Sequence, residues 1–365
     1  MNQKIKVSVL GATGMVGQNY IRLLDNHPWF QIVDAAASPR SAGKKYSDAV
    51  GQNWLMPGAI PAAVHHLIVR DVRDFDTIPK NVECVFSAMD LPKKEETRDL
   101  EFDYAKAGFP IISNSSANRW TNDVPMIIPE INPDHVNVIP IQQSGRGLPA
   151  NGFVAVKPNC SVQSYLVALH ALEEAGFPVD QVQVTTLQAL SGGGYATITS
   201  PEMEENVIPY ISGEEEKTEN EPLKILGQIT NDGIENTDRI NISATCTRVP
   251  VIDGHMAVVY IRFKDKKISI DAIKSIWSEY KGLPQIENLP TGPERPIIYI
   301  DDENRPQPKL DRDLENGMAV TIGRLAKDKF FDFRFVALSH NTVRGAAGGA
   351  ILMAELLVKK GYIHA

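Results

Sequence analysis

The chain contains three cysteines, at positions 84, 160 and 246, and only Cys160 has surroundings that suit nucleophilic chemistry. It follows a Pro–Asn turn in VKPNCSVQSYL, where the apolar residues from 161 to 175 predict a helix that begins beside the thiol. Free amides and the dipole at a helix N-terminus lower the pKa of a thiol. Cys84 and Cys246 lie in apolar, strand-like runs, so we expect both to be buried and inert.

A thiol that attacks a carbonyl carbon needs a partner that accepts and returns a proton, and histidine has a suitable pKa near neutrality. His255 lies between a turn and a predicted strand in RVPVIDGHMAVVY, with Arg248 seven residues before it and expected on the same rim. His170 falls in an apolar helix and His65 in a loop region, so structural roles are expected there. Spacing alone leaves a structural role for His255 open.

A glycine-rich turn, GATGMVG, contains Gly11, Gly14 and Gly17. It joins a predicted strand to an apolar helix and then a second strand, at residues 4–10, 15–26 and 30–38. Backbone amides at such a helix N-terminus bind a pyrophosphate. The spacing is GxxGxxG rather than GxGxxG, and the alternative interpretation is a tight turn that binds no ligand.

The end of the second predicted strand indicates which nicotinamide cofactor the turn would hold. Asp34 lies about 20 residues after the glycines, where a carboxylate would bind ribose hydroxyls. The strand continues through DAAAS, so its tip is better placed at Ser38, Arg40 and Ser41. Arg40 there favours the 2′-phosphate of NADP over NAD, unless it is an ordinary exposed loop arginine.

Strand-like runs at 82–88 and 110–113 are separated by a charged, helix-like segment that ends near Gly108. Strands that alternate with helices predict a mostly parallel, doubly wound sheet. The insertion at 39–68 is expected to form loops or short elements.

After Asn159 the pattern changes, and strand-like runs follow at 181–189, 241–248 and 256–263. The last two are expected to form an antiparallel sheet, with a charged helix in SGEEEKTENEPLKILGQI before them. The proline-rich stretch 284–308 predicts a long irregular connection. The fold class is therefore α/β, with a Rossmann-like N-terminal domain and a second, α+β domain with a mixed or antiparallel sheet.

Composition excludes several partners. The 37 basic and 45 acidic residues give a net charge of -8, so there is no overall positive field to attract nucleic acid or an anionic membrane. Three scattered cysteines argue against a disulfide framework or a cysteine-based metal site, and no metal is expected. We expect a cytoplasmic protein that binds a small molecule, with neither a nucleic-acid nor a membrane partner.

Nine motifs occur in the order found in one enzyme family: GATGMVGQ, NSSANRW, PEIN, PNCSVQ, LQALSGGGY, NVIPYISGEEEK, RVPVIDGH, GRL and HNTVRGAAGGAIL. Over nearly its whole length the chain resembles the aspartate-β-semialdehyde dehydrogenase family, most closely the branch found in archaea and fungi. The resemblance implies an NADP-binding domain at 1–158 plus 341–365 and a catalytic and dimerisation domain at 159–340. It also implies a homodimer or homotetramer.

The resemblance implies that a Cys160 thiolate attacks the aldehyde to give a thiohemiacetal, from which a hydride passes to NADP and leaves a thioacyl enzyme that phosphate cleaves. In the biosynthetic direction the enzyme would reduce L-aspartyl 4-phosphate, in the pathway to lysine, threonine, methionine and isoleucine. His255 resembles the acid/base, Arg248 the ligand of the substrate carboxylate, and Gln188 the side chain that orients the substrate.

Glu214 and Lys217 resemble the contacts to the substrate amine and phosphate. Glu215 or Glu216 is an alternative partner, because three glutamates are consecutive, and a solvated helix face is the alternative for the whole segment. Arg119 resembles the phosphate-binding arginine, with a surface ion pair as its alternative.

Twelve residues fall where similar proteins contact NADP: Thr13, Gly14, Met15, Val16, Ser38, Arg40, Ser41, Ser87, Ser115, Ser191, Gly192 and Asn341. The small residues 345–349 predict that the last helix lies against the cofactor and the helix that follows Cys160, with plain tight packing as the alternative. Two other functions remain open: malonyl-CoA reductase, which uses the same thioester chemistry, and a noncatalytic NADP-binding sensor.

Overall fold

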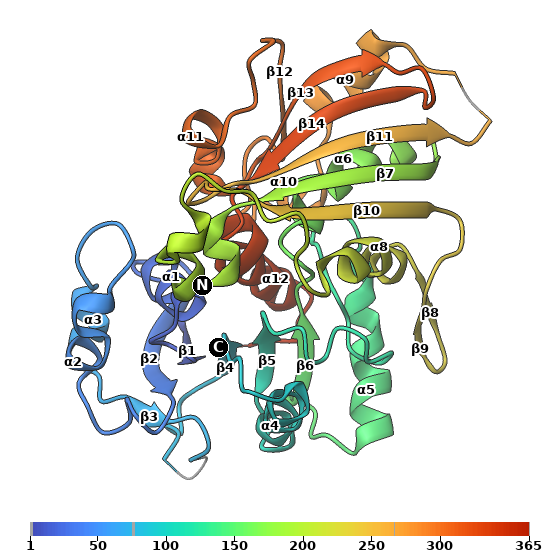
Figure 1. Cartoon of the computed structure of the whole chain (residues 1–365). Helices are drawn as coiled ribbons and strands as arrows, with labels where there is room; N and C mark the ends of the chain where they lie inside the picture. Colours follow the sequence, from blue (N-terminus) through green and yellow to red (C-terminus); the bar gives the residue numbers. More distant parts are fainter. Residues whose placement is uncertain (1–2, 75–76, 266, 365) are drawn as a thin grey trace.

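The computed structural model describes residues 3–74, 77–265 and 267–364, and two six-stranded sheets dominate it (Figure 1). The first sheet has the order β3-β2-β1-β4-β5-β6, and all its strands are parallel. This is the doubly wound order of dinucleotide-binding domains, as predicted. Its strands are β1 (Ile5–Leu10), β2 (Phe30–Ala37), β3 (Arg70–Asp71), β4 (Cys84–Ser87), β5 (Pro110–Ser113) and β6 (Phe153–Val156).

Helices cover the first sheet, so its central strands are almost entirely buried and rich in valine and isoleucine. Helix α4 ends where predicted, because Gly108 adopts a φ of 95° that favours glycine. The insertion at 39–68 forms short helices, as predicted. The helices are α1 (Met15–Leu23), α2 (Tyr46–Val50), α3 (Ala62–His65), α4 (Lys94–Lys106), α5 (Ile139–Arg146) and α12 (Gly348–Lys359).

The second sheet is mixed, with the order β10-β7-β11-β14-β13-β12. Helices α6 and α9 cover one of its faces, where the buried Trp277 donates from Nε1 to the carbonyl of Ala168 over 2.9 Å. The sheet consists of β7 (Val179–Gln188), β10 (Asn241–Arg248), β11 (His255–Phe263), β12 (Ile297–Ile300), β13 (Val320–Lys327) and β14 (Phe333–Ser339). The other elements are α6 (Leu166–Glu174), α7 (Tyr195–Ile198), α8 (Glu214–Ile225), β8 (Gln228–Thr230), β9 (Gly233–Glu235), α9 (Ile270–Glu279), α10 (Leu283–Ile286) and α11 (Pro308–Asp311).

Two expectations about this second sheet were wrong. The strands β10 and β11 do not pair with each other, because β7 lies between them, parallel to β10 and antiparallel to β11. The proline-rich stretch also contains a strand, β12, which pairs parallel with β13 at the edge of the sheet. Four consecutive apolar or aromatic residues after Pro296 suffice for an edge strand, where a preceding proline is tolerated.

The expected helix at 161–175 also differs from the structure. A short 3₁₀ turn spans Val162–Ser164, and the α-helix α6 begins only at Leu166. Tyr165 lies between the 3₁₀ turn and α6, and its φ of -137° and ψ of -25° are not helical. Cys160 therefore does not lie in the first turn of an α-helix.

The chain returns from the second sheet to the first through residues 340–347 and then α12, which packs near β5 and α1 (Figure 1). A buried ion pair supports this return: Arg344 Nη1 lies 2.8 Å from Glu130 Oε1, and both side chains are almost inaccessible. The same nitrogen donates to the carbonyl of Met318 over 2.7 Å. The hydroxyl of Tyr280 donates to the carbonyl of Glu130. Among the described residues, no helix is both long and apolar enough to cross a membrane.

We predict that Glu130→Gln destabilises the fold by about 3–5 kcal/mol, because it leaves the Arg344 guanidinium buried without its counter-charge. Urea unfolding of the wild type and variant measures this difference. The control is Asp99→Asn in the exposed pair with Arg98, which should change stability by less than about 1 kcal/mol. A loss in Glu130→Gln no larger than in the control would contradict the role given to the buried pair.

Candidate active site

The ends of three neighbouring strands bring together the residues expected to handle the substrate. Gln188 is the last residue of β7, Arg248 is the last of β10, and the two are register partners. His255 is the first residue of β11, which runs antiparallel beside β7. Because β7 and β10 are parallel and β11 starts where they end, all three side chains lie at one edge of the second sheet.

Cys160 and His255 form the centre of this edge. Cys160 Sγ lies 3.3 Å from His255 Nε2, and the amide of Ala189 donates to His255 Nδ1 over 3.0 Å. A backbone N–H can only donate, so Nδ1 carries no proton and the neutral ring carries its proton on Nε2. Burial, assisted by the positive charge of Arg248, lowers the pKa of His255 to about 3. The ring is therefore neutral at pH 7 and directs an N–H at the sulfur.

The expected lowering of the Cys160 pKa is not what the structure shows. Burial and then the negative charge of Glu214 raise the pKa of this thiol above its usual value, against the opposing effects of Lys157, Arg119 and Arg248. No α-helix N-terminus lies beside the thiol to offset burial, because α6 begins only at Leu166. Cys160 is therefore a thiol at neutral pH.

Glycines allow two close approaches to this centre. A Cβ on Gly345 would lie 2.8 Å from Cys160 Cβ, so the turn before α12 approaches the cysteine as expected. A Cβ on Gly192 would lie 2.9 Å from both Arg248 Nη1 and His255 Cε1. Any larger residue at either position would displace the reactive side chains.

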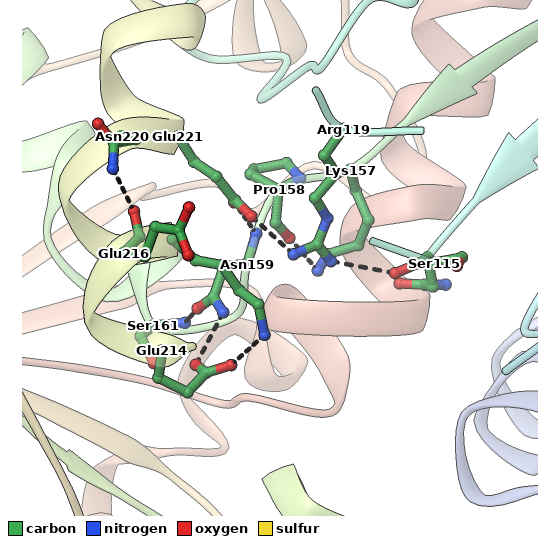
Figure 2. A network of polar contacts seen from close by, with 12 residues as sticks. Ser115, Arg119, Lys157, Pro158, Asn159, Ser161, Glu214, Glu216, Asn220 and Glu221 are labelled. Atoms are coloured by element: carbon green, nitrogen blue, oxygen red, sulfur yellow. Dashed lines mark hydrogen bonds and ion pairs between the residues drawn. The ribbon is translucent and has the colours of Figure 1, made fainter. Parts of the chain in front are cut away.

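Glu214, the first residue of α8, lies against Asn159, the residue before Cys160 (Figure 2). It accepts hydrogen bonds from Lys217 Nζ at 2.7 Å, Asn159 Nδ2 at 2.8 Å and Gln188 Nε2 at 3.1 Å. Burial opposes its ionisation, but Lys217 and these donors outweigh burial and lower the pKa to about 2. Glu214 is therefore a charged carboxylate at neutral pH.

The two alternative glutamates point elsewhere. Glu215 accepts a hydrogen bond from the amide of Cys246 in β10, at 3.2 Å. The backbone carbonyl of Glu216 accepts a hydrogen bond from the side chain of Asn220. Neither of them lines the cavity beside Cys160. Of the three consecutive glutamates, Glu214 is the one that the fold brings to the cysteine.

Glu221 is two turns further along α8 and was not expected at the site. Its carboxylate accepts hydrogen bonds from the amide of Asn159 and from Arg119 Nη1, the latter at 2.8 Å (Figure 2). Arg119 therefore makes a buried ion pair rather than a surface one. Lys157, Asn159 and Glu221 are the polar groups that sequence reasoning missed. Only the spacing of seven residues between the two glutamates, which places both on one helix face, signalled Glu221.

A cavity of about 300 Å³ opens beside Cys160, between the carboxyl ends of β4, β5 and β6 and the edge of the second sheet. Ligands of doubly wound sheets bind at this end of the strands. Nine of the expected site residues line it: Val16, Ser115, Arg119, Cys160, Ser191, Gly192, Glu214, Lys217 and Asn341. The remaining expected residues do not line it: Gln188, Arg248 and His255 lie at the ends of their strands, Ser87 ends β4, Ser38, Arg40 and Ser41 follow β2, and Thr13, Gly14 and Met15 lie along the nucleotide turn.

The nucleotide turn has the features of an anion-binding helix start. Gly11 has a φ of 73°, and a Cβ on Gly17 would lie 2.1 Å from the carbonyl oxygen of Gly11, so both positions require glycine. Helix α1 follows Gly14 without a side-chain cap, which leaves the first amides of Met15 and Val16 open to a ligand. Thr13 lies in the same turn and is half-buried.

The tip of β2 has the arrangement expected from the sequence. Asp34 is buried, accepts from the Ser8 hydroxyl at 2.6 Å, and forms an ion pair with Arg70 at 2.8 Å. Its carboxylate is therefore not available to a ribose. Ser38 and Arg40 follow the end of β2 and are exposed, and Ser41 is half-buried beside them.

Two further residues expected to bind the cofactor, Asn341 and Ser87, differ in their position relative to the cavity. Asn341 links three loops, since its Nδ2 donates to the Ser191 hydroxyl at 2.7 Å and its Oδ1 accepts from the amide of Gly254 at 2.8 Å. The hydroxyl of Ser87 instead donates to the buried Glu101 at 2.7 Å, so that side chain is not brought to the cavity. No cluster of three or more potential metal ligands occurs within 3–74, 77–265 and 267–364.

Comparisons with known proteins agree with this geometry. Residues 6–139 match the profile of the semialdehyde dehydrogenase NAD binding domain, and residues 169–344 match that of the semialdehyde dehydrogenase dimerisation domain. Aspartate-semialdehyde dehydrogenase from Archaeoglobus fulgidus is 44% identical over 99% of this chain and 100% of the relative. The protein of the same name from Aspergillus fumigatus is 42% identical over 99% of both chains.

A solved structure is similar over the same length. The crystal structure of aspartate semialdehyde dehydrogenase with NADP from Candida albicans superposes with a TM-score of 0.88 at 36% identity. The match covers 99% of this chain and 100% of that one. The similarity therefore includes both sheets and the site between them.

We predict that alkylation of Cys160 by iodoacetamide accelerates steadily from pH 7 to pH 9, because only the thiolate reacts and burial raises the pKa of this thiol. Peptide mapping by mass spectrometry measures the modification at each pH. The buried Cys246 serves as the internal control and should react much more slowly. A rate that is already constant between pH 6 and pH 7 would mean a stable thiolate and would contradict this account.

Proposed function

The chain belongs to the aspartate-semialdehyde dehydrogenase family, and on that premise we propose that it interconverts L-aspartyl 4-phosphate and L-aspartate 4-semialdehyde, using NADPH or NADP and releasing or consuming phosphate. The observation that carries this proposal is the 3.3 Å contact between Cys160 Sγ and His255 Nε2 at the wall of a charged cavity. In the biosynthetic direction, the reaction serves synthesis of lysine, threonine, methionine and isoleucine.

The charges around Cys160 complement an amino acid whose side chain ends in a carbonyl group. Arg248 presents a guanidinium, held by the carbonyl of Ala189 at 2.8 Å, that suits both oxygens of the substrate carboxylate. Glu214 supplies the negative charge for the substrate amine. Gln188, hydrogen-bonded to Glu214, orients the substrate between these two charges. The proposed substrate thus complements the charges of the site.

The covalent steps follow from the position of the sulfur. The Cys160 thiol first loses its proton to bulk water, because the neutral His255 ring already carries a proton on Nε2. The thiolate then adds to the aldehyde carbon, and the C–S bond forms as the π bond of the carbonyl breaks and its oxygen gains the negative charge. The Nε2–H of His255 donates to the thiolate before this step and can donate to the new oxygen after it. His255 can accept a proton on Nε2 only after it has donated the proton that Nε2 already carries. Its role as acid and base therefore requires that this proton leaves the ring and returns during turnover.

Release of the product requires phosphate. Arg119 and Lys217 both line the cavity and are the proposed phosphate ligands. A phosphate oxygen attacks the thioester carbon, the C–S bond breaks, and the thiolate of Cys160 is restored. Glu221 keeps Arg119 at the cavity through their 2.8 Å ion pair. The two cations thus favour phosphate over water as the nucleophile.

The residues of the first sheet fit NADP. The uncapped start of α1 after Gly14 suits the pyrophosphate, and the exposed Arg40 beside Ser38 and Ser41 suits a 2′-phosphate. Bound NADP would supply the oxidation of the thiohemiacetal to a thioester by accepting a hydride. Ser191, Gly192 and Asn341 line the cavity and are proposed to hold its reactive end.

We also propose the domain boundaries and assembly that the resemblance implies. Residues 1–158 plus 341–365 form the cofactor-binding unit, and 159–340 form the catalytic and dimerisation unit. Half-buried residues of β11, Met256, Val258 and Tyr260, lie on the face of the second sheet opposite its core. A homodimer or homotetramer that covers this partly apolar face is expected, and light scattering of the purified protein measures the number of chains.

A spectrophotometric assay tests the proposed reaction directly. NADPH should form from L-aspartate 4-semialdehyde and NADP at a rate that depends on added phosphate. Cys160→Ser should lower the rate at least about a thousandfold, as expected for loss of a covalent nucleophile, while NADP binding persists. Cys246→Ser is the matched control, because its buried side chain lies 3.6 Å from the Thr218 hydroxyl and away from the cavity.

Three outcomes would count against the proposal. NADPH oxidation with malonyl-CoA but not with the aspartyl substrate would indicate malonyl-CoA reductase. NADP binding without turnover of either substrate would indicate a sensor. A fully active Cys160→Ser variant would rule out the thioester route.

The cofactor preference has its own test. Arg40→Ala should raise the KM for NADP by about 10- to 100-fold, the effect of losing a charged hydrogen bond, and leave the KM for NAD unchanged. Arg98→Ala, on the exposed surface of α4, is the control. Equal losses for both cofactors in Arg40→Ala would exclude a contact with the 2′-phosphate.

A further inference from the structure

Lys157 is a buried amine at the reactive cavity to which the reaction described above gives no role. It follows β6 directly, its side chain is 2% exposed, and it lines the cavity together with Arg119 and Cys160. Among the residues that the structure describes, its Nζ donates a hydrogen bond to one acceptor, the carbonyl of Pro158. Because an ammonium group has three donors, this amine has donors left for a ligand in the cavity that it lines.

A second buried lysine shows what a purely structural role looks like. Lys224 donates from Nζ to the carbonyls of Arg119 at 2.8 Å and Thr121 at 2.7 Å, and it does not line the cavity. Those bonds fix the loop that contains Arg119. Lys157 has fewer bonds of this kind and faces the space where ligands enter.

The charges around Lys157 are already paired with other groups. On α8, Glu221 pairs with Arg119 and Glu214 pairs with Lys217. No ion pair joins Lys157 to a carboxylate among the residues that the structure describes. Burial, with the positive charge of Arg119, lowers the pKa of Lys157 to about 7, against the opposing charges of Glu221 and Glu214. The amine therefore gains or loses its proton easily near neutral pH.

We propose that Lys157 is a third cationic ligand of the phosphate group, beside Arg119 and Lys217, and that it takes up a proton when phosphate or the acyl phosphate enters the cavity. This inference rests on the proposed function, since it adds a ligand to the same site. A phosphate dianion near the amine favours its charged form. The proton comes from bulk water and returns to it when the phosphate group leaves.

Proton uptake gives the site a way to avoid an unpaired buried charge. Without phosphate, Lys157 can stay neutral, which lowers the cost of its burial. With phosphate, the ammonium and the dianion compensate each other. The affinity for phosphate should therefore fall as the pH rises above about 7, because the amine is then harder to protonate.

The first test is steady-state kinetics of Lys157→Met, which keeps the length of the side chain and removes its charge. The KM for phosphate should rise about 10- to 100-fold, and the KM values for aspartate semialdehyde and NADP should stay unchanged. The control is Lys106→Met, a change to an exposed lysine on α4. An unchanged KM for phosphate would overturn the proposal. Parallel changes in kcat, every KM and the unfolding midpoint would indicate a structural role and overturn it too.

The second test needs no turnover. Inorganic phosphate is titrated calorimetrically into the wild type saturated with NADP, in two buffers of different ionisation enthalpy at pH 7. The wild type should take up more protons per bound phosphate than Lys157→Met. Equal uptake by the two proteins would overturn the proposal. If the wild type does not turn over aspartate semialdehyde, the proposed function fails, but this titration still decides whether Lys157 binds phosphate.

Discussion

Two carboxylates on one face of α8, the half-buried Glu214 and the buried Glu221, hold the residue that precedes the reactive cysteine. Glu214 binds the side chain of Asn159, and Glu221 binds its backbone amide (Figure 2). Helix α8 packs on β10 of the second sheet, whereas Asn159 follows β6 of the first. The position of Cys160 relative to the edge with Gln188, Arg248 and His255 therefore depends on these two contacts. Glu214 also pairs with Lys217, and Glu221 pairs with Arg119. The same two carboxylates therefore hold both cations at the cavity.

Burial then explains why the groups at the site have unusual protonation states. A thiol, an imidazole and an amine are all held away from water, and in each case burial favours the neutral form. Glu214 is the exception, because three donors keep its carboxylate charged. The site thus holds a neutral Cys160 and a neutral His255 beside a charged Glu214. Substrate and phosphate bring the charges that this arrangement lacks.

Much of this arrangement was predictable from the sequence. The order of strands and helices in the first half predicted the doubly wound sheet, and a parallel strand carries its functional residues at its carboxyl end, which is where Lys157 to Cys160 lie. The exposed position of Arg40 after a longer β2 was also predictable, because the apolar run continues past Asp34. Local patterns sufficed in these cases because the structural cause is local.

Other features depend on contacts between distant segments, which local patterns do not contain. Strand β7 lies between β10 and β11, and β12 pairs with β13. Which strands pair depends on contacts between distant segments. The pKa of Cys160 rises because of its burial between the two sheets, and the sequence shows only the turn that precedes it. Lys157 and Glu221 look like ordinary surface charges in the sequence. Their roles appear only when α8 and the end of β6 are placed side by side.

The central claim is that Cys160 becomes acylated and that phosphate releases the acyl group. Intact-protein mass spectrometry after mixing the enzyme with L-aspartate 4-semialdehyde and NADP, without phosphate, tests it most directly. The enzyme should gain the mass of one aspartyl acyl group, which maps to the Cys160 peptide and disappears when phosphate is added. An enzyme that turns over with phosphate but shows no acyl adduct without it, or an adduct on another residue, would contradict the account.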